Sequence, residues 1–383
     1  MKRTRRAVLG GCAALVTGGS AGCLELSGGS SGTGEEDNHR NRSEPTDPEP
    51  TEAEPTGTES DPEYEAVYEA VSPSVVRIQT YVEQLDGFVD GGGEAGSGSG
   101  FLYDSGTLVT NDHVLGDADT VRAQTADGTW LETTVVGRDP YSDLAVLETE
   151  GPVPGTPLSL ADPTPPIGTE VMVVGSPLGL RGTATTGIVS GRNRTIPASS
   201  TADGAFSIAD AVQTDAALNQ GNSGGPIVTL DGEVVGVATA TQGENVGFGV
   251  SAPLVREVVP ELIATGSYDH SYMGIQVLEV EPLLASANDL PEARGVYVAD
   301  TVPDGPADGV LLGTNGETTV EGATVPVGGD TIVGLNDTPI AADADLSRFL
   351  ALETRPGDTI AVTVRRNGRT ETVDLELGAR PEP

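Results

Sequence analysis

The chain has 383 residues, 37% of them hydrophobic, and a formal net charge of −38 at pH 7. Such an acidic chain is not expected to bind nucleic acid, because a phosphate backbone requires a basic face. Its only lysine is Lys2, which excludes a P-loop of the Gly-Lys-Ser/Thr type. We interpret the acidity as adaptation to concentrated salt in a halophilic prokaryote, since salt screens the repulsion between like charges. An acidic binding surface is the alternative.

Residues 1–22 predict an export signal. Arg5 and Arg6 precede an apolar stretch at 7–17 that is too short to span a bilayer, and the arginine pair is similar to a twin-arginine signal. The Ser-Ala-Gly-Cys sequence that ends at Cys23 is similar to a lipoprotein box, in which the cysteine is lipidated. We therefore expect a lipoprotein on the outer face of the cell membrane. If Cys23 is not lipidated, an ordinary cleaved signal and a secreted protein are expected instead.

Residues 23–62 are rich in Gly, Ser, Thr, Glu and Pro, which predicts a disordered acidic linker. A tether between a lipid anchor and a folded domain is its simplest use. Of the two cysteines, Cys12 lies in the expected signal and Cys23 is the first residue of the linker. The folded part is therefore expected to have no disulfide. The chain also has no His-Glu-x-x-His sequence and no cysteine cluster, so we expect no metal and no other cofactor.

Residues 63–266 contain short β-rich runs separated by turn signals. Asp127-Gly128 and Asp231-Gly232 lie between apolar runs, as in two-residue hairpins. Many short strands at this spacing predict an antiparallel barrel or sandwich, and the segment is long enough for two small barrels packed together. The expected strands lie at 75–78, 106–110, 133–137, 170–175, 233–240 and 245–250.

A helix is predicted at 251–265. Ser251 can cap its start and Gly266 can end it. The apolar stripe of this helix consists of Leu254, Val255, Val258, Val259, Leu262 and Ile263. The helix is expected to close the first domain and to lead into the second.

Residues 267–383 predict a separate second domain. Its expected elements are strands at 295–300 and 331–334, a helix around 344–352, and a closing hairpin of 359–365 with 370–377. The hairpin is expected to turn at Asn367-Gly368, a residue pair typical of two-residue turns.

Three residues form a candidate catalytic set. His113 follows the expected strand at 106–110, Asp143 precedes the apolar run Leu-Ala-Val-Leu, and Ser223 lies within Gly-Asn-Ser-Gly-Gly. A serine hydroxyl is a weak nucleophile at neutral pH unless a base accepts its proton. A histidine is such a base, and an aspartate orients its ring and stabilises the imidazolium. A turn, a strand cap or a core histidine could explain each motif alone, but their joint order and strand context predict a serine protease.

The glycines around Ser223 predict an oxyanion hole. A nucleophilic serine needs a sharp turn that aims backbone N–H groups at the developing negative charge. Gly221 allows its N–H to point into the site beside that of Ser223, while Gly224 and Gly225 allow the turn and the close approach of a substrate. Gly221 and Ser223 are therefore the expected oxyanion donors.

From about residue 72 to residue 377 the chain resembles the HtrA/Deg family, trypsin-like proteases with C-terminal PDZ domains. Besides the triad, the matching sequences are Gly-Ser-Gly-Phe at 98–101, Val-Gly-Ser-Pro at 174–177, Thr-Gly-Ile-Val-Ser at 186–190, Gln-Thr-Asp-Ala-Ala at 213–217 and Asn-Val-Gly-Phe-Gly-Val at 245–250. The resemblance implies a mostly β protein. A chymotrypsin-like double β-barrel protease domain is expected at 63–266, followed by a small α+β PDZ domain at 267–383.

The same resemblance implies roles for individual protease residues. His113 is the expected general base, Asp143 orients it, and Ser223 is the nucleophile. Leu218 falls where the family lines its S1 pocket, which implies a preference for small or medium aliphatic residues.

In the second domain, Tyr272, Met273, Gly274 and Ile275 match the family's carboxylate-binding loop. Backbone N–H groups of such a loop bind a peptide C-terminus while the peptide adds as a strand. A buried edge strand is the alternative for these four residues. Residues 314–327 depart from the family pattern and are interpreted as an insertion.

Together these features predict an ATP-independent serine endopeptidase that acts on unfolded or damaged proteins outside the cell membrane. Unfolded polypeptides and peptide C-termini are the expected partners, and the resemblance implies a homotrimer to which Tyr64 and Tyr68 contribute. The alternative is a non-proteolytic holdase or surface scaffold that binds peptides with a resting active site.

Overall fold

A computed structural model of the chain describes residues 62–82, 93–176, 182–197, 207–219, 221–241 and 245–382. The expected export signal, Cys23 and all but the last residue of the expected linker lie outside these residues. Among the helices of the described ranges, none is long and apolar enough to cross a membrane.

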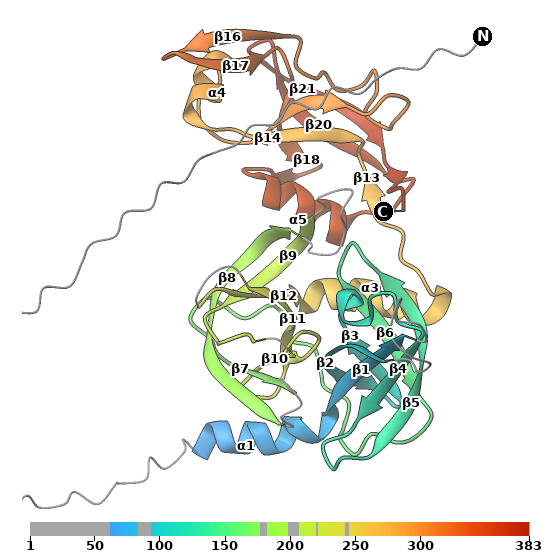
Figure 1. Cartoon of the computed structure of the whole chain (residues 1–383). Helices are drawn as coiled ribbons and strands as arrows, with labels where there is room; N and C mark the ends of the chain where they lie inside the picture. The colour runs from blue at the N-terminus through green and yellow to red at the C-terminus, as the bar shows by residue number, and fades with distance from the viewer. Residues whose placement is uncertain are drawn as a thin grey trace, which may run out of the picture. The chain divides into compact units, whose positions relative to one another are not determined.

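Two closed barrels of six antiparallel strands form the first part of the fold (Figure 1, teal and green to yellow). The first barrel, in the order β1-β2-β3-β6-β5-β4, consists of β1 (Val75–Val82), β2 (Gly93–Asp104), β3 (Thr107–Thr110), β4 (Thr120–Gln124), β5 (Trp130–Asp139) and β6 (Leu144–Thr149). The second, in the order β10-β11-β12-β9-β8-β7, consists of β7 (Glu170–Gly175), β8 (Thr183–Pro197), β9 (Ser207–Thr214), β10 (Pro226–Thr229), β11 (Val234–Thr241) and β12 (Gly247–Ser251). The predicted double-barrel fold is confirmed.

Each barrel encloses an apolar core of its own. Ile78, Leu108 and Leu147 are fully buried inside the first, and Val173 and Ile227 are fully buried inside the second. Branched aliphatic side chains suit such positions, because they pack well on a pleated surface. Closure of each sheet also leaves it no free edge strand.

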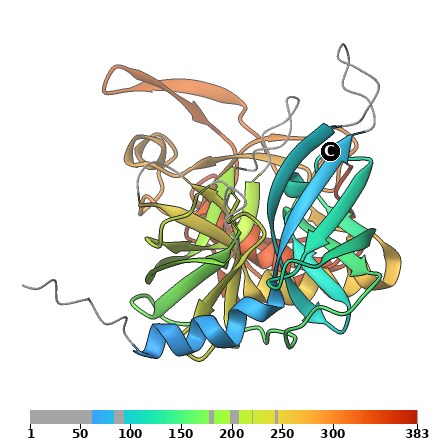
Figure 2. The same ribbon diagram turned by 60° about the horizontal axis from the view of Figure 1, so that its bottom comes forward.

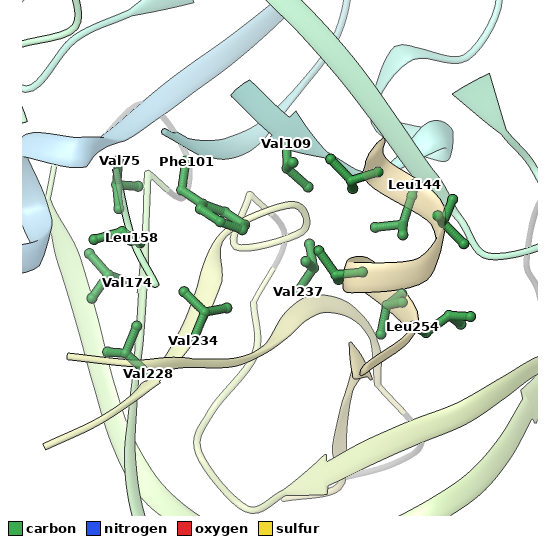
Figure 3. Close-up of a cluster of buried hydrophobic side chains, with 14 of the residues drawn as sticks. Val75, Phe101, Val109, Leu144, Leu158, Val174, Val228, Val234, Val237 and Leu254 are labelled. Atoms are coloured by element: carbon green, nitrogen blue, oxygen red, sulfur yellow. The ribbon is translucent and has the colours of Figure 1, made fainter. Parts of the chain in front are cut away.

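A further apolar cluster joins the two barrels. Figure 3 shows Phe101 and Val109 of the first barrel in the same cluster as Val174 and Val237 of the second, with Leu254 beside them. All five side chains are buried. The cluster holds the two barrels together, so residues of the two barrels that meet at this interface keep a defined geometry.

Helix α3 (Ala252–Thr265) matches the predicted helix and contributes Leu254 to this cluster. Oγ of Ser251 accepts a hydrogen bond from the N–H of Leu254 at 3.4 Å, and Gly266 ends the helix with φ of 88°. Of the predicted stripe, only Ile263 is exposed, at 42%. At about 100° per residue it lies at the outer margin of the stripe, which accounts for its exposure.

Two short helices precede the first barrel and were not predicted. They are α1 (Pro62–Val71) and the 3-10 helix η1 (Ser72–Ser74). Val67 and Val71 of α1 are buried in the cluster between the barrels. Figure 2 shows α1 beside the second barrel, on the way to β1 of the first. The helix therefore also contributes to the packing of one barrel on the other.

The second domain (orange to red in Figure 1) is an α+β fold around a sheet in the order β14-β15-β18-β20-β21. Its elements are β13 (Ser271–Tyr272), β14 (Ile275–Glu279), α4 (Pro282–Ala287), β15 (Val296–Thr301), β16 (Gly316–Val320), β17 (Ala323–Val327), β18 (Thr331–Leu335), β19 (Thr338–Pro339), α5 (Asp343–Glu353), β20 (Thr359–Arg366), β21 (Arg369–Glu376) and β22 (Gly378–Ala379). The strands, helix and closing hairpin predicted for this domain are all present. Strand β14 is at one end of the sheet.

The insertion at 314–327 forms the hairpin β16–β17, which pairs only with itself. Val325 of this hairpin is buried in a small cluster with Tyr297 and with Leu284 of α4. The insertion is therefore a packed part of the domain.

Candidate active site

His113 lies in a one-turn helix, α2 (Asp112–Leu115), directly after β3 of the first barrel. Its backbone N–H donates a hydrogen bond to Oδ1 of Asp143 at 3.0 Å. The neighbouring Asn111 donates from Nδ2 to the backbone carbonyl of Asp143 at 2.8 Å. These two bonds tie the start of α2 to the turn that carries Asp143.

Asp143 lies between β5 and β6 in the left-handed region, with φ of 55°, which Asp and Asn adopt more readily than most residues. Its Oδ1 and Oδ2 lie 2.9 and 2.8 Å from Nδ1 of His113. Because the carboxylate engages Nδ1, the other ring nitrogen, Nε2, is left to accept a proton from a hydroxyl. The two residues thus have the geometry of a base and its orienting group.

Thr239, on β11 of the second barrel, links Asp143 to Ser223. Its Oγ1 donates a hydrogen bond to Oδ2 of Asp143, and its carbonyl accepts one from Oγ of Ser223 at 3.4 Å. His113 and Asp143 belong to the first barrel, whereas Ser223 belongs to the second. The interface between the barrels therefore brings all three predicted residues to one place.

The electrostatics of the site favour a protonatable His113. Burial opposes the charged imidazolium, but the hydrogen bond and charge of Asp143, together with the charge of Asp112, outweigh burial and raise the pKa of His113. Burial also raises the pKa of Asp112, against the hydrogen bond and charge of Arg138. Nε of Arg138, whose side chain is exposed, lies 2.6 Å from Oδ1 of the buried Asp112, so an ion pair lies next to the histidine in the chain.

Ser223 lies in the loop between β9 and β10, where hydrogen bonds fix the backbone. The N–H of Gly225 donates to the carbonyl of Asn222 at 2.8 Å, and the N–H of Gly224 donates to the carbonyl of Ala238 at 2.8 Å. The carbonyl and N–H of a trans peptide point in opposite directions. The bond to Asn222 therefore turns the N–H of Ser223 away from Gly225. Gly221 has φ of 103°, a conformation that L side chains rarely adopt.

Leu218, the predicted S1 residue, lies on the same loop and is half-buried against the core of the second barrel. A Cβ on Gly247 of β12 would lie 2.8 Å from both Cγ and Cδ1 of Leu218. The absence of a side chain at 247 thus makes room for Leu218. Leu218 therefore packs directly against the backbone of Gly247.

The four residues predicted to bind a peptide C-terminus lie in the second domain, at the turn from β13 to β14. Met273 as a whole is only 2% exposed, and its side chain packs in the core of the domain. The carbonyls of Met273 and Gly274 accept from the N–H groups of Ala307 and Val302, at 3.0 and 2.8 Å. Gly274 has φ of 72°. The turn is therefore fixed through its carbonyl groups, and Tyr272 and Ile275 flank it.

In the part of the chain that the structure describes, no group of three or more His, Cys, Asp or Glu side chains is placed to hold a metal ion. Thr239 was not predicted from the sequence.

Comparison with known families and proteins gives consistent matches. Residues 98–237 match the trypsin-like peptidase domain, and residues 271–377 match the PDZ domain. A probable periplasmic serine endoprotease DegP-like from Rhizobium meliloti (strain 1021) is 38% identical over 291 residues, which are 74% of this chain and 53% of the relative. The periplasmic serine endoprotease DegP of Salmonella typhimurium is 33% identical over 309 residues, 76% of this chain and 60% of its own length. The chain thus spans about half the length of the curated relatives it matches.

The match to solved structures covers more of their length than the match to the curated relatives covers of theirs. The HtrA-type protease AlgW with a decapeptide has a TM-score of 0.64 and 30% identity, over 84% of this chain and 99% of the other. A serine endoprotease from Yersinia pestis has a TM-score of 0.57 and 28% identity, over 83% of this chain and 98% of the other.

Proposed function

Because the chain belongs to the HtrA family of trypsin-like serine proteases with a PDZ domain, we propose that it is a serine endopeptidase with His113, Asp143 and Ser223 as its triad. The observation that carries the proposal is the set of contacts around Asp143. Its carboxylate holds Nδ1 of His113 at 2.8 Å and accepts from Thr239, whose carbonyl accepts from Ser223. These contacts join His113 to Asp143 directly and Asp143 to Ser223 through Thr239.

In this mechanism Nε2 of His113 accepts the proton of the Ser223 hydroxyl as its oxygen attacks the peptide carbonyl. The carboxylate of Asp143 holds the ring and stabilises the imidazolium. The N–H groups of Gly221 and Ser223 stabilise the oxyanion, and His113 returns the proton to the leaving amine. Water then hydrolyses the acyl-enzyme by the same steps in reverse order. The chain has no P-loop of the Gly-Lys type, which supports independence from ATP.

Active-site labelling tests this proposal directly. A fluorophosphonate probe should label the parent protein at high salt, whereas Ser223→Ala and His113→Ala should stay unlabelled while remaining folded. Ser105→Ala, a substitution at an exposed serine, is the matched control and should label like the parent. Labelling of Ser223→Ala equal to the parent, or a folded parent that neither labels nor cleaves casein, would refute the proposal and favour a peptide-binding holdase.

Unfolded or damaged proteins are the proposed substrates. The relatives' names describe endoproteases, and the related AlgW structure contains a decapeptide. Leu218, opposite Gly247, would line S1 and favour small or medium aliphatic residues. The PDZ turn of Tyr272, Met273, Gly274 and Ile275 would bind peptide C-termini, with the peptide added to β14. A reduced, alkylated protein should be cleaved faster than its native form.

We further propose export, which the relatives' periplasmic location supports, and lipidation at Cys23. Mass spectrometry of the protein from its native membrane would detect the lipid. A homotrimer is proposed from family membership, with the half-buried rings of Tyr64 and Tyr68 near the contact. Light scattering would give the mass of the assembly. Adaptation to high salt is proposed from the net charge of −38.

A further inference from the structure

Ser99, on β2 of the first barrel, contacts the loop that carries Ser223 on the second. The residue is fully buried, at 0% exposure. Its N–H donates to the carbonyl of Ser223 at 2.7 Å. Its Oγ donates to the carbonyl of Gly221 at 2.6 Å and accepts from the N–H of Ser176 at 2.9 Å. One residue of the first barrel therefore binds the backbone on both sides of Asn222.

The hydroxyl of Ser99 completes the anchoring of one peptide group. The peptide between Gly221 and Asn222 is held through its carbonyl by Ser99, and through its N–H by the carbonyl of Asn219, at 3.0 Å. The next peptides are also held, because the carbonyl of Asn222 accepts from Gly225 and that of Ser223 accepts from Ser99. Removal of the hydroxyl would release the first carbonyl, at Gly221, and the N–H of Ser176, but would leave the other two carbonyls of this loop held.

Gly221 is the residue where such a release matters most. Glycine has no Cβ to restrict its dihedral angles, so the surroundings must hold its φ of 103°. The space around Ser99 is tight, since a Cβ on Gly224 would lie 2.1 Å from the carbonyl oxygen of Ser99, and one on Gly175 would lie 3.0 Å from its Oγ. The burial of Ser99 means that bulk water does not already share its bond to Gly221.

We propose that Ser99 is a positioning residue of the reaction: its hydroxyl fixes the peptide between Gly221 and Asn222 and so keeps the oxyanion donors in place. The inference rests on the proposed endopeptidase function. Donors that are held in advance stabilise the tetrahedral state more than the ground state, because they need no reorganisation during the reaction. Loss of the hydroxyl should therefore weaken binding of a tetrahedral adduct selectively, without a similar loss of substrate affinity.

The test compares two ligands of the full-length protein. A peptide boronate forms a tetrahedral adduct with Ser223 and probes the oxyanion site, whereas the carboxylate product of the same peptide probes ground-state binding. Direct loss of an oxyanion donor costs about 10²–10³-fold in rate. For the indirect change Ser99→Ala we expect a loss of about 10- to 100-fold in boronate affinity and in kcat/KM. The product affinity should stay within about twofold.

Ser74→Ala is the matched control. Ser74 is also fully buried, and its Oγ donates to the carbonyl of Thr156 at 2.6 Å. This substitution should lower the melting temperature, as we also expect for Ser99→Ala, but leave the ratio of the two affinities unchanged. Ser99→Cys keeps a similar side chain with a much weaker donor. Ser99→Cys should lower boronate affinity by a smaller factor than Ser99→Ala does. If Ser99→Ala does not fold, Ser99→Cys is compared with the parent instead.

Equal losses of boronate and product affinity in the folded Ser99 variants would show a merely structural role and overturn the inference. Unchanged boronate affinity in those variants would overturn it as well. A parent protein that neither labels nor hydrolyses peptides would instead refute the proposed function, and the inference with it. Parent activity thus separates the two failures.

Discussion

Nε2 of His270 lies 2.7 Å from Oδ2 of Asp139, which joins the segment before the PDZ domain to the turn that ends in Asp143. The same Asp139 oxygen accepts from the N–H of Ser142 at 3.2 Å and from its hydroxyl. The imidazole also packs edge-on against Tyr268 and Tyr141, with ring centroids 4.7 and 5.5 Å apart. His270 is therefore part of the scaffold beneath the triad, although it touches none of the three residues in the contacts described.

Replacement of His270 by alanine should loosen this scaffold. The carboxylate of Asp139 is only 3% exposed and would lose one of its partners, which costs about 1–3 kcal/mol of unfolding free energy. Because Ser142 precedes Asp143, kcat/KM on a small peptide should fall as well. Thermal unfolding and peptide hydrolysis measure the two effects. Asp269→Ala, at the exposed neighbour, should change neither. A His270→Ala protein as stable and active as the parent would contradict the assignment.

The pH dependence of kcat/KM follows from the raised pKa of His113. The imidazole must be neutral to act as a base, so activity should rise with pH around a midpoint above the ordinary value of about 6.5. Asp112→Asn removes a negative charge that raises this pKa and leaves Arg138 nearby, so the midpoint should move to lower pH. A midpoint that moves upward in this variant would contradict the electrostatic argument.

The same shift affects stability with the opposite sense. The folded-state pKa of His113 lies above its unfolded value, so the charged imidazolium stabilises the fold fully below the unfolded pKa. This contribution is lost as pH rises through the folded pKa. Activity should therefore rise over a range in which this one stabilising contribution declines.

Local patterns predicted the strands and turns well. The strand Glu170–Gly175 has the predicted bounds, and the turn at Asn367-Gly368 has positive φ at both residues, 51° and 73°. Strand β2 was harder to predict, because Gly93, Gly96, Gly98 and Gly100 give it little intrinsic β-propensity. Its conformation depends on pairing with β1 and β3, which a local pattern does not show.

The triad was predicted because each of its residues lies in a distinctive local motif. The sequences around Thr239 and Ser99 do not indicate which distant residues these two side chains contact. Thr239 is 96 residues from Asp143 and Ser99 is 122 residues from Gly221. Both contacts exist only because two separate barrels pack together, and barrel packing sets distances that the spacing of residues along the chain does not.

Thr239→Val should impair both catalysis and stability. The variant keeps the shape of the side chain and removes the donor to Oδ2 of Asp143. A hydrogen bond to a charged group contributes about 1.5–3 kcal/mol, so we expect kcat/KM to fall about 10- to 100-fold. Thr239→Ser, which keeps the hydroxyl, should retain most of the activity. Equal activity of the two variants would show that the bond does not support the triad.

Added salt should stabilise the protein. A net charge of −38 implies self-repulsion, which is screened as the Debye length falls from about 10 Å at 0.1 M to about 3 Å at 1 M salt. The melting temperature should therefore rise steeply with KCl at pH 7. The rise should be smaller near pH 4, where many carboxylates are protonated. An equal rise at both pH values would indicate that salt acts through something other than charge screening.

The PDZ domain should depend on the ion pair between Arg366 and Asp330. Nε and an Nη of Arg366 donate to the two oxygens of Asp330, at 2.8 and 2.6 Å, and the carboxylate is fully buried. Arg366→Met leaves this buried charge without its cation, which costs about 3–5 kcal/mol. Hydrogen exchange should become faster in β18 and β20, while labelling of Ser223 persists.

Arg369→Met, at an exposed site on β21, is the matched control and should stay within about 0.5 kcal/mol of the parent. If Arg366→Met exchanges no faster than the control, the ion pair does not stabilise the domain. Asp330→Asn in the Arg366→Met background should restore part of the loss, because it removes the unpaired charge.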